Sequence, residues 1–144
     1  MNEILIVEDS AADAEEVKRA LKKAGVKNPV KWIDDGARAM AYLESVAVPP
    51  TVVFLDVKLP GFTGFDILDR LRDNPNFNRT LRIVFSSLDD IGTIKEAYAH
   101  GAQSFLSKPV SEEELADLIR AFQGHWLINY RLRQGRKAAT PPVK

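Results

Sequence analysis

Short apolar runs alternate with longer amphipathic stretches along the 144 residues of this chain. Runs typical of β-strands cover residues 3–8, 30–34, 51–56, 81–86 and 103–107. Stretches with helical spacing of apolar positions cover residues 11–24, 36–46, 64–72 and 90–100. Residues 4–7, 52–55 and 83–85 are continuously apolar, which is typical of central parallel strands covered on both faces. The pattern predicts an α/β fold with a doubly wound, five-stranded parallel sheet and helices on both faces.

A last helix is predicted to begin at Ser111, because Glu114 stands three residues later as in a capping box. Apolar residues continue at helical spacing from Leu115 to Trp126. The helix is therefore predicted to extend as far as Trp126.

Residues 124–144 are interpreted as a helical extension followed by a basic, flexible tail. All five charged groups in residues 131–144 are basic, whereas residues 1–130 carry 15 basic and 20 acidic groups, a net charge of −5. Such a tail can touch nucleic acid, but no recognition helix accompanies it, so we expect no nucleic-acid binding. Two interpretations stay open for the aromatic residues. Trp126 packs on the domain, or it joins Leu127 and Tyr130 in a homodimer or kinase contact.

The composition excludes several classes of protein and site. The chain contains no cysteine, which rules out disulfides, zinc–thiolate sites and thiol nucleophiles. It has no apolar stretch long enough to span a bilayer and no secretory-signal pattern at its start. We therefore expect a cytoplasmic location and no membrane contact.

Polar side chains stand where the predicted strands end. Following the order of the strands, they are Glu8 and Asp9, then Asp56, Ser86 and Lys108. Functional groups in such sheets gather outside the carboxyl ends of the strands, so these side chains are predicted to converge. Clustered carboxylates repel one another unless a cation lies among them, and Mg2+ prefers oxygen ligands. A carboxylate can also attack phosphorus, and a lysine can neutralise phosphoryl oxygens.

Each of these residues also has a purely structural interpretation. Asp56 could cap a turn, and Glu8 and Asp9 could cap the first helix. Ser86 could bond nearby backbone, and Lys108 could lie in solvent. Their joint placement at the strand ends favours a shared site over these separate roles.

Four segments carry a resemblance to a known family. They are residues 4–10 (ILIVEDS), 53–64 (VFLDVKLPGFTG), 83–87 (IVFSS) and 105–109 (FLSKP). With these segments the chain resembles the receiver domain of bacterial two-component response regulators. The resemblance implies a receiver domain over residues 1–123 with the flavodoxin-like strand order 2-1-3-4-5.

The resemblance also implies how the residues at the strand ends work together. Asp56 would accept a phosphoryl group, and Lys108 would pair with the phosphoryl oxygens. Glu8 and Asp9 would be the acidic pair that holds Mg2+. Asp56 itself and the backbone carbonyl of Lys58 would complete the protein ligands of the metal.

A switch is implied next to this site. Ser86 would be a hydroxyl that moves toward the phosphoryl group, and Phe105 would be an aromatic ring that turns inward with it. The bond between Lys108 and Pro109 is expected to be cis. In the family, the residue two past the switch hydroxyl tunes hydrolysis. Here it is Leu88, which offers no polar group to orient water, so slow loss of the phosphoryl group is predicted.

The function implied by the resemblance is a phosphorylation-controlled binding module rather than a turnover enzyme. A sensor histidine kinase or a phosphotransfer protein would supply the phosphoryl group, and a downstream protein target would read the phosphorylated state. Only 144 − 123 = 21 residues follow residue 123, so a stand-alone regulator without an output domain is expected. Residues 33–36 and 122–127 further resemble stand-alone regulators that partner phytochrome-type kinases.

Two alternative functions fit the residues less well. A phosphatase with an aspartyl-phosphate intermediate would carry an aspartate at the position of Lys58, so the lysine argues against it. A phosphorylation-independent interaction module of the same fold would have lost one of the acidic pair Glu8 and Asp9, the aspartate Asp56 or the lysine Lys108. The chain retains all of them.

Overall fold

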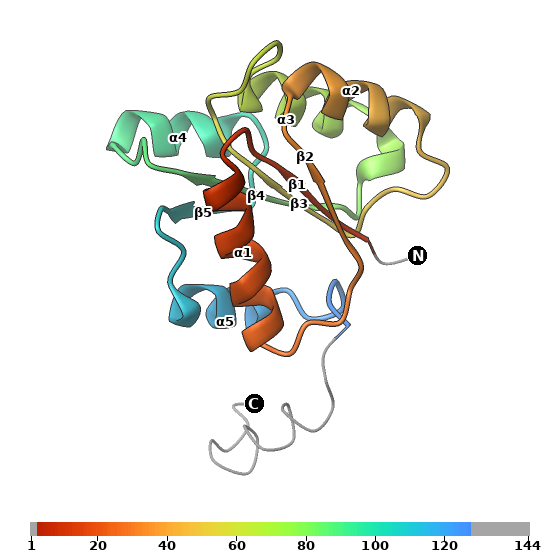
Figure 1. Cartoon of the computed structure of the whole chain (residues 1–144). Helices are drawn as coiled ribbons and strands as arrows, with labels where there is room; N and C mark the ends of the chain where they lie inside the picture. The colour runs from red at the N-terminus through yellow and green to blue at the C-terminus, as the bar shows by residue number, and fades with distance from the viewer. Residues whose placement is uncertain (1–2, 128–144) are drawn as a thin grey trace.

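The sheet in the computed structural model has five parallel strands in the order β2-β1-β3-β4-β5, and the structure describes residues 3–127. The strands are β1 (Ile4–Val7), β2 (Val30–Ile33), β3 (Val52–Leu55), β4 (Leu81–Ser86) and β5 (Ser104–Ser107). The helices are α1 (Ala11–Lys23), α2 (Gly36–Ser45), α3 (Gly64–Asp73), α4 (Ile91–Ala99) and α5 (Glu112–Ala121), with a short 3-10 helix, η1 (Pro75–Phe77). The predicted fold, strand order and alternation of elements are confirmed (Figure 1).

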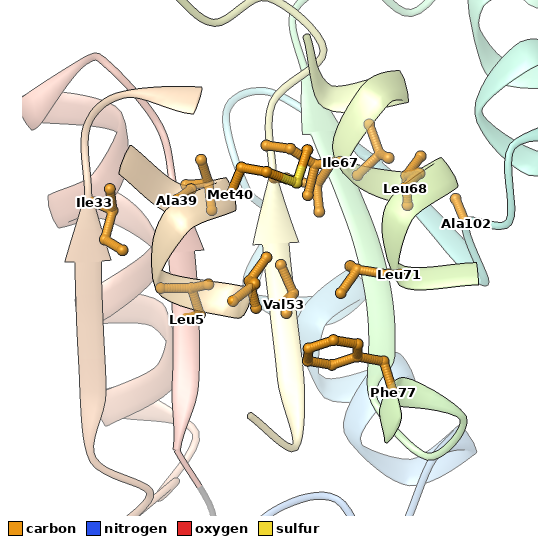
Figure 2. Close-up of a cluster of buried hydrophobic side chains, with 14 of the residues drawn as sticks. Leu5, Ile33, Ala39, Met40, Val53, Ile67, Leu68, Leu71, Phe77 and Ala102 are labelled. Atoms are coloured by element: carbon orange, nitrogen blue, oxygen red, sulfur yellow. The ribbon is translucent and has the colours of Figure 1, made fainter. Parts of the chain in front are cut away.

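Two hydrophobic layers, one on each face of the sheet, explain why the central strands are apolar at every position. Ile4 and Ile6 of β1 pack with α1 and α5, whereas Leu5 and Val7 pack with α2 and α3. Figure 1 shows α1 and α5 on one side of the sheet and α2 and α3 on the other. Figure 2 shows the second layer, in which side chains of α2, α3 and η1 gather over the central strands. Both faces are therefore covered, as a parallel sheet requires.

The strands end at matching levels along one edge of the sheet. Val7 of β1 pairs with Leu55 of β3, and Leu55 pairs with Val84 of β4. Ser86 at the end of β4 pairs with Ser107 at the end of β5. The residues that follow these positions are therefore neighbours at the carboxyl edge of the sheet.

Helix α1 begins with a serine cap at this edge. The hydroxyl of Ser10 accepts a hydrogen bond from the backbone N–H of Asp13 at 3.2 Å, which satisfies a free donor of the first turn. The interpretation of Glu8 or Asp9 as the helix cap is therefore wrong. The Glu8 carboxylate instead accepts a hydrogen bond from the backbone N–H of Ser10 at 3.0 Å, and a second of its oxygens stays available at the edge.

Helix α3 begins against the backbone that follows β3. The hydroxyl of Thr63 accepts from the backbone N–H of Asp66 at 3.2 Å, and the Asp66 carboxylate accepts from the Thr63 N–H at 3.0 Å. This reciprocal pair is a capping box. A Cβ atom at Gly64 would clash with the carbonyl oxygen of Asp56, so only glycine permits the close approach.

The last helix is shorter than predicted. It begins after Ser111, whose hydroxyl accepts from the backbone N–H of Glu114 at 3.3 Å, as expected. However, it ends at Ala121 rather than continuing to Trp126. Gly124 has a φ angle of +102°, which a right-handed helix cannot contain. The prediction that the helix continues to Trp126 is therefore wrong.

Trp126 reaches the core without a helix. Its side chain is buried, and its ring lies 6.3 Å from the ring of Phe54 in β3, measured between centroids. It belongs to the hydrophobic layer of α1 and α5. The interpretation that Trp126 packs on the domain is confirmed, whereas Tyr130 lies outside the described residues.

Hydrogen bonds hold residues 122–127, the C-terminal clasp, against the opposite edge of the sheet. The hydroxyl of Thr51, which precedes β3, donates to the carbonyl of His125 at 3.1 Å. The backbone N–H of Leu127 donates to the side-chain oxygen of Asn28, which precedes β2, at 2.6 Å. The clasp therefore joins the loops that enter the strands, at the amino edge of the sheet.

Candidate functional site

Three carboxylates meet at the carboxyl edge and form what we call the acidic cluster (Glu8, Asp9 and Asp56). Glu8 follows β1 and Asp56 follows β3, and these two residues are only 1% and 7% exposed. Asp9 is exposed to solvent. One oxygen atom from each residue lies within 4.8 Å of those of the other two. The structure thus brings together the carboxylates that the strand ends predict.

The ammonium group of Lys108 lies among carboxylates. Its Nζ atom donates to Oε1 of Glu8 at 2.6 Å and to Oδ2 of Asp56 at 2.9 Å. A third hydrogen bond runs to Oδ2 of Asp13, in the first turn of α1, at 2.8 Å. The backbone N–H of Lys108 bonds the carbonyl of Ser86 at 3.1 Å, which anchors the lysine beside β4. Lys108 is therefore a part of the site rather than a solvated surface lysine.

Burial and hydrogen bonding set the ionisation of the buried groups. Burial raises the pKa of Glu8 to about 7, although the hydrogen bond from Lys108 opposes the change. Burial lowers the pKa of Lys108, but its hydrogen bonds to carboxylates outweigh burial and raise that pKa above its ordinary value. Lys108 is therefore charged at neutral pH, and Glu8 ionises readily only where neighbouring positive charge compensates it.

The donor atoms of the acidic cluster fit Mg2+. Glu8, Asp9 and Asp56 offer hard oxygen ligands, which Mg2+ prefers, and the exposed side of Asp9 admits the waters that the ion keeps. The backbone carbonyl of Lys58, the fourth ligand that the resemblance implies, belongs to the loop that follows β3. The carboxylates together carry more negative charge than the one positive charge of the Lys108 ammonium can neutralise. A divalent cation would therefore relieve the repulsion between the carboxylates.

The implied switch residues belong to β4 and β5, which follow β3 in the order of the sheet. Ser86 is buried, and its hydroxyl accepts a hydrogen bond from the backbone N–H of Leu88 at 3.0 Å. This contact fits the structural interpretation of Ser86, and a movement toward the acidic cluster would break it. Phe105 of β5 is half-buried against the layer of α2 and α3. The bond between Lys108 and Pro109 is cis, as the resemblance implies.

Asp13 is the residue of the site that sequence reasoning missed. It stands three residues after Ser10, and its backbone N–H donates to the Ser10 hydroxyl in the cap of α1, a bond that does not involve its carboxylate. Its hydrogen bond to Lys108 depends on how α1 lies across the sheet, which no local pattern reveals. The sequence offers only a weak signal for this role of Asp13, namely a carboxylate in the first turn of a helix that begins directly after a strand.

A family model described as the response regulator receiver domain matches residues 4–120 of the chain. The matched segment contains all five strands and the start of every helix. It also contains the acidic cluster, Lys108 and Asp13.

Two curated relatives match over most of their own length. The probable methanogenesis regulatory protein FilR2 of Methanothrix harundinacea is 28% identical over 128 residues, which cover 86% of this chain and 83% of that protein. The response regulator Rcp1 of Synechocystis is 26% identical over 129 residues, which cover 86% of this chain and 88% of that protein. The similarity therefore extends over nearly the whole of both proteins.

Solved structures show the same fold. The Mn2+-bound form of Rcp1 superposes with a TM-score of 0.70 at 25% identity, covering 85% of this chain and 92% of that one. The phosphorylated cyanobacterial phytochrome response regulator RcpA superposes with a TM-score of 0.71 at 26% identity, covering 87% of this chain and 93% of that one. One similar structure thus holds a divalent metal and another carries a phosphoryl group.

Proposed function

The chain belongs to the response regulator receiver family, and from this premise we propose that Asp56 accepts a phosphoryl group from a phosphohistidine. The observation that carries the proposal is the ammonium of Lys108, which bonds both Asp56 and Glu8 at the carboxyl edge. A phosphoryl group on Asp56 would arrive within reach of this positive charge. Phosphoryl transfer relies mainly on such positioning and charge compensation.

The proposed transfer is a direct displacement at phosphorus. A carboxylate oxygen of Asp56 forms a bond to phosphorus as the bond between phosphorus and the histidine nitrogen of the partner breaks. The histidine ring keeps the electron pair and leaves as neutral imidazole, because its other nitrogen already carries a proton. Lys108 donates hydrogen bonds to the phosphoryl oxygens and holds them in place.

Metal binding is a part of the proposal. Glu8, Asp9, Asp56 and the backbone carbonyl of Lys58 would hold Mg2+ through oxygen atoms. The bound ion would supply positive charge to the phosphoryl oxygens. Neither Glu8 nor Asp9 is needed as the cap of α1, because Ser10 fills that role.

Phosphorylation would then be read through Ser86 and Phe105. The phosphoryl group adds roughly −1.5 to −2 charge and three acceptor oxygens. The hydroxyl of Ser86 would exchange its bond with the Leu88 N–H for a phosphoryl oxygen, and Phe105 would turn inward. These new contacts would shift the population toward a second conformation that presents a different binding surface. The size of the shift is set by how much the contacts favour that conformation.

The proposed partners follow from this chemistry. A sensor histidine kinase of the phytochrome type, or a phosphotransfer protein, would supply the phosphoryl group, in keeping with the similarity to RcpA. A downstream protein would bind the phosphorylated surface, and the proposed role includes no turnover of a separate substrate. We place this exchange in the cytoplasm. Within residues 3–127, no helix is long and apolar enough to cross a membrane.

The test uses the full chain with acetyl phosphate and Mg2+. Intact mass spectrometry should show one added phosphoryl group on the native protein and none on Asp56→Asn. Asp117→Asn is the matched control, because Asp117 lies on α5 and pairs only with Arg120 among the described residues. Phosphorylation of Asp56→Asn to the native extent would refute the proposal.

A further inference from the structure

We propose that Asp13 is a positioning residue that restrains Lys108 before phosphorylation and releases it to the incoming phosphoryl group. The proposal rests on the function proposed for Asp56. It adds a carboxylate that neither binds the metal nor accepts the phosphoryl group but sets how readily the transfer occurs.

All three N–H donors of the Lys108 ammonium group already make hydrogen bonds. An ammonium has three donors, and Lys108 makes three hydrogen bonds to carboxylate oxygens, those of Glu8, Asp13 and Asp56. The lengths of these bonds, between 2.6 and 2.9 Å, are those of charge-assisted hydrogen bonds. Lys108 can therefore donate to a phosphoryl oxygen only by giving up one of them.

The bond to Asp13 is the one that costs least to break. The side chain of Asp13 is 34% exposed, whereas those of Glu8 and Asp56 are 1% and 11% exposed. Water can solvate a released Asp13 carboxylate, but it cannot replace the lysine beside buried Glu8. During phosphoryl transfer, Lys108 should therefore keep Glu8 and leave Asp13.

The position of Asp13 makes it a fixed competitor for the lysine. Asp13 stands in the first turn of α1, and the Ser10 cap holds its backbone through the hydrogen bond at 3.2 Å. Its side chain is the most exposed of the three carboxylate partners of the ammonium. An anionic phosphodonor must then displace a carboxylate and overcome its repulsion. The native residue should slow phosphorylation.

The first experiment measures the rate of phosphorylation by acetyl phosphate in the presence of Mg2+. Asp13→Asn, and Asp13→Ala as a second variant, should react about fivefold faster than the native protein. Asp13→Glu, which keeps the charge and can reach the lysine, should return the rate toward the native value. Glu15→Gln removes a negative charge from the exposed side of the same helix and should leave the rate unchanged. Equal rates for the native protein and both neutral variants would overturn the proposal.

The second experiment does not depend on phosphorylation. In the metal-free full chain, nuclear magnetic resonance of lysine side-chain ammonium groups should detect Lys108 as a slowly exchanging, hydrogen-bonded signal. Asp13→Asn should shift this signal and speed its hydrogen exchange, whereas Glu15→Gln should not. An unchanged Lys108 signal in Asp13→Asn would show that no restraint exists, even where Asp56 is phosphorylated. If the restraint is seen and Asp56 accepts no phosphoryl group, the proposed function fails and Asp13 has no transfer to control, which also overturns the proposal.

Discussion

The two edges of the sheet are built from opposite kinds of contact. At the carboxyl edge, the carboxylates of Glu8 and Asp56, which follow β1 and β3, share the ammonium of Lys108 with Asp13 of α1. At the amino edge, the C-terminal clasp closes the core with the buried ring of Trp126 and with hydrogen bonds to the loops before β2 and β3. At the carboxyl edge, a charged group can give up one hydrogen-bond partner for another. At the amino edge, an aromatic ring packed in the core has no alternative partner. We infer that the carboxyl edge serves function and the amino edge serves stability.

This difference predicts that changes at one edge leave the property of the other edge intact. A charge removed from the carboxyl edge should alter phosphoryl chemistry in a protein that still folds. An apolar group removed from the amino edge should lower stability in a protein that is still phosphorylated while folded. The following predictions test this separation.

The largest effect on stability is expected from Trp126→Ala. Removing a buried tryptophan side chain should lower the free energy of unfolding by about 3–5 kcal/mol, since it leaves a cavity beside Phe54. Urea unfolding measures the change, and Leu127→Ala is the control, because Leu127 is 44% exposed. A variant as stable as the native protein would show that the clasp does not close the core.

Lys108→Met should have the largest effect on the chemistry. Loss of the positive charge should slow phosphorylation by acetyl phosphate roughly 100-fold, because a preorganised donor to the phosphoryl oxygens is gone. The matched control is Lys22→Ala, which removes an exposed lysine at the far end of α1. A rate within twofold to threefold of the native value would mean that Lys108 does not compensate phosphoryl charge, against the proposed mechanism.

Mg2+ affinity should depend on pH through Glu8. Burial raises the pKa of Glu8 to about 7, so this carboxyl binds a proton below that pH in the folded, metal-free protein. A protonated carboxyl does not ligate Mg2+, and affinity should therefore fall as the pH falls through 7. Calorimetric titration should give about tenfold weaker binding at about pH 6 than at about pH 8. Glu8→Gln should bind more weakly and lose this dependence, and a native affinity independent of pH would contradict the assignment of Glu8 as a ligand.

The smallest effect concerns the lifetime of the phosphorylated state. Leu88 offers no polar group to a water that attacks the phosphoryl group, so Leu88→Glu should speed decay about fivefold. Ile91→Glu is the control, because Ile91 is 72% exposed on α4. The decay is followed after removal of acetyl phosphate. Equal lifetimes for the native protein and Leu88→Glu would show that position 88 does not influence hydrolysis of the phosphoryl group.

Much of the carboxyl edge could be predicted because it depends on strand order and strand ends. The apolar runs located β1, β3 and β4 to within a residue or two of their bounds. A parallel sheet then places Glu8 beside Asp56, as the register of Val7 and Leu55 confirms. No more than the direction and order of the strands is needed for this result. The roles of Ser86 and Phe105 stay predictions.

The features that could not be predicted depend on tertiary geometry. Phe122 and Trp126 stand at helical spacing, but the chain leaves the helix at Ala121 and still buries the indole. The same spacing of apolar residues is compatible with a helix or with a turn back onto the core, and Gly124 was the signal that favoured the turn. Asp13 was hidden for a similar reason, since its contact to Lys108 depends on how α1 lies across the sheet.

The most direct test of the central claim is to locate the phosphoryl group on the chain. The native protein is phosphorylated by acetyl phosphate with Mg2+, the acyl phosphate is reduced with borohydride, and the product is mapped by peptide mass spectrometry. We predict that the aspartate at position 56 is converted to homoserine, while Asp9 and Asp13 remain unchanged. The conversion should disappear when Mg2+ is chelated. A phosphoryl group trapped on another carboxylate, or no conversion at Asp56 in folded protein, would contradict the assignment of Asp56 as the acceptor.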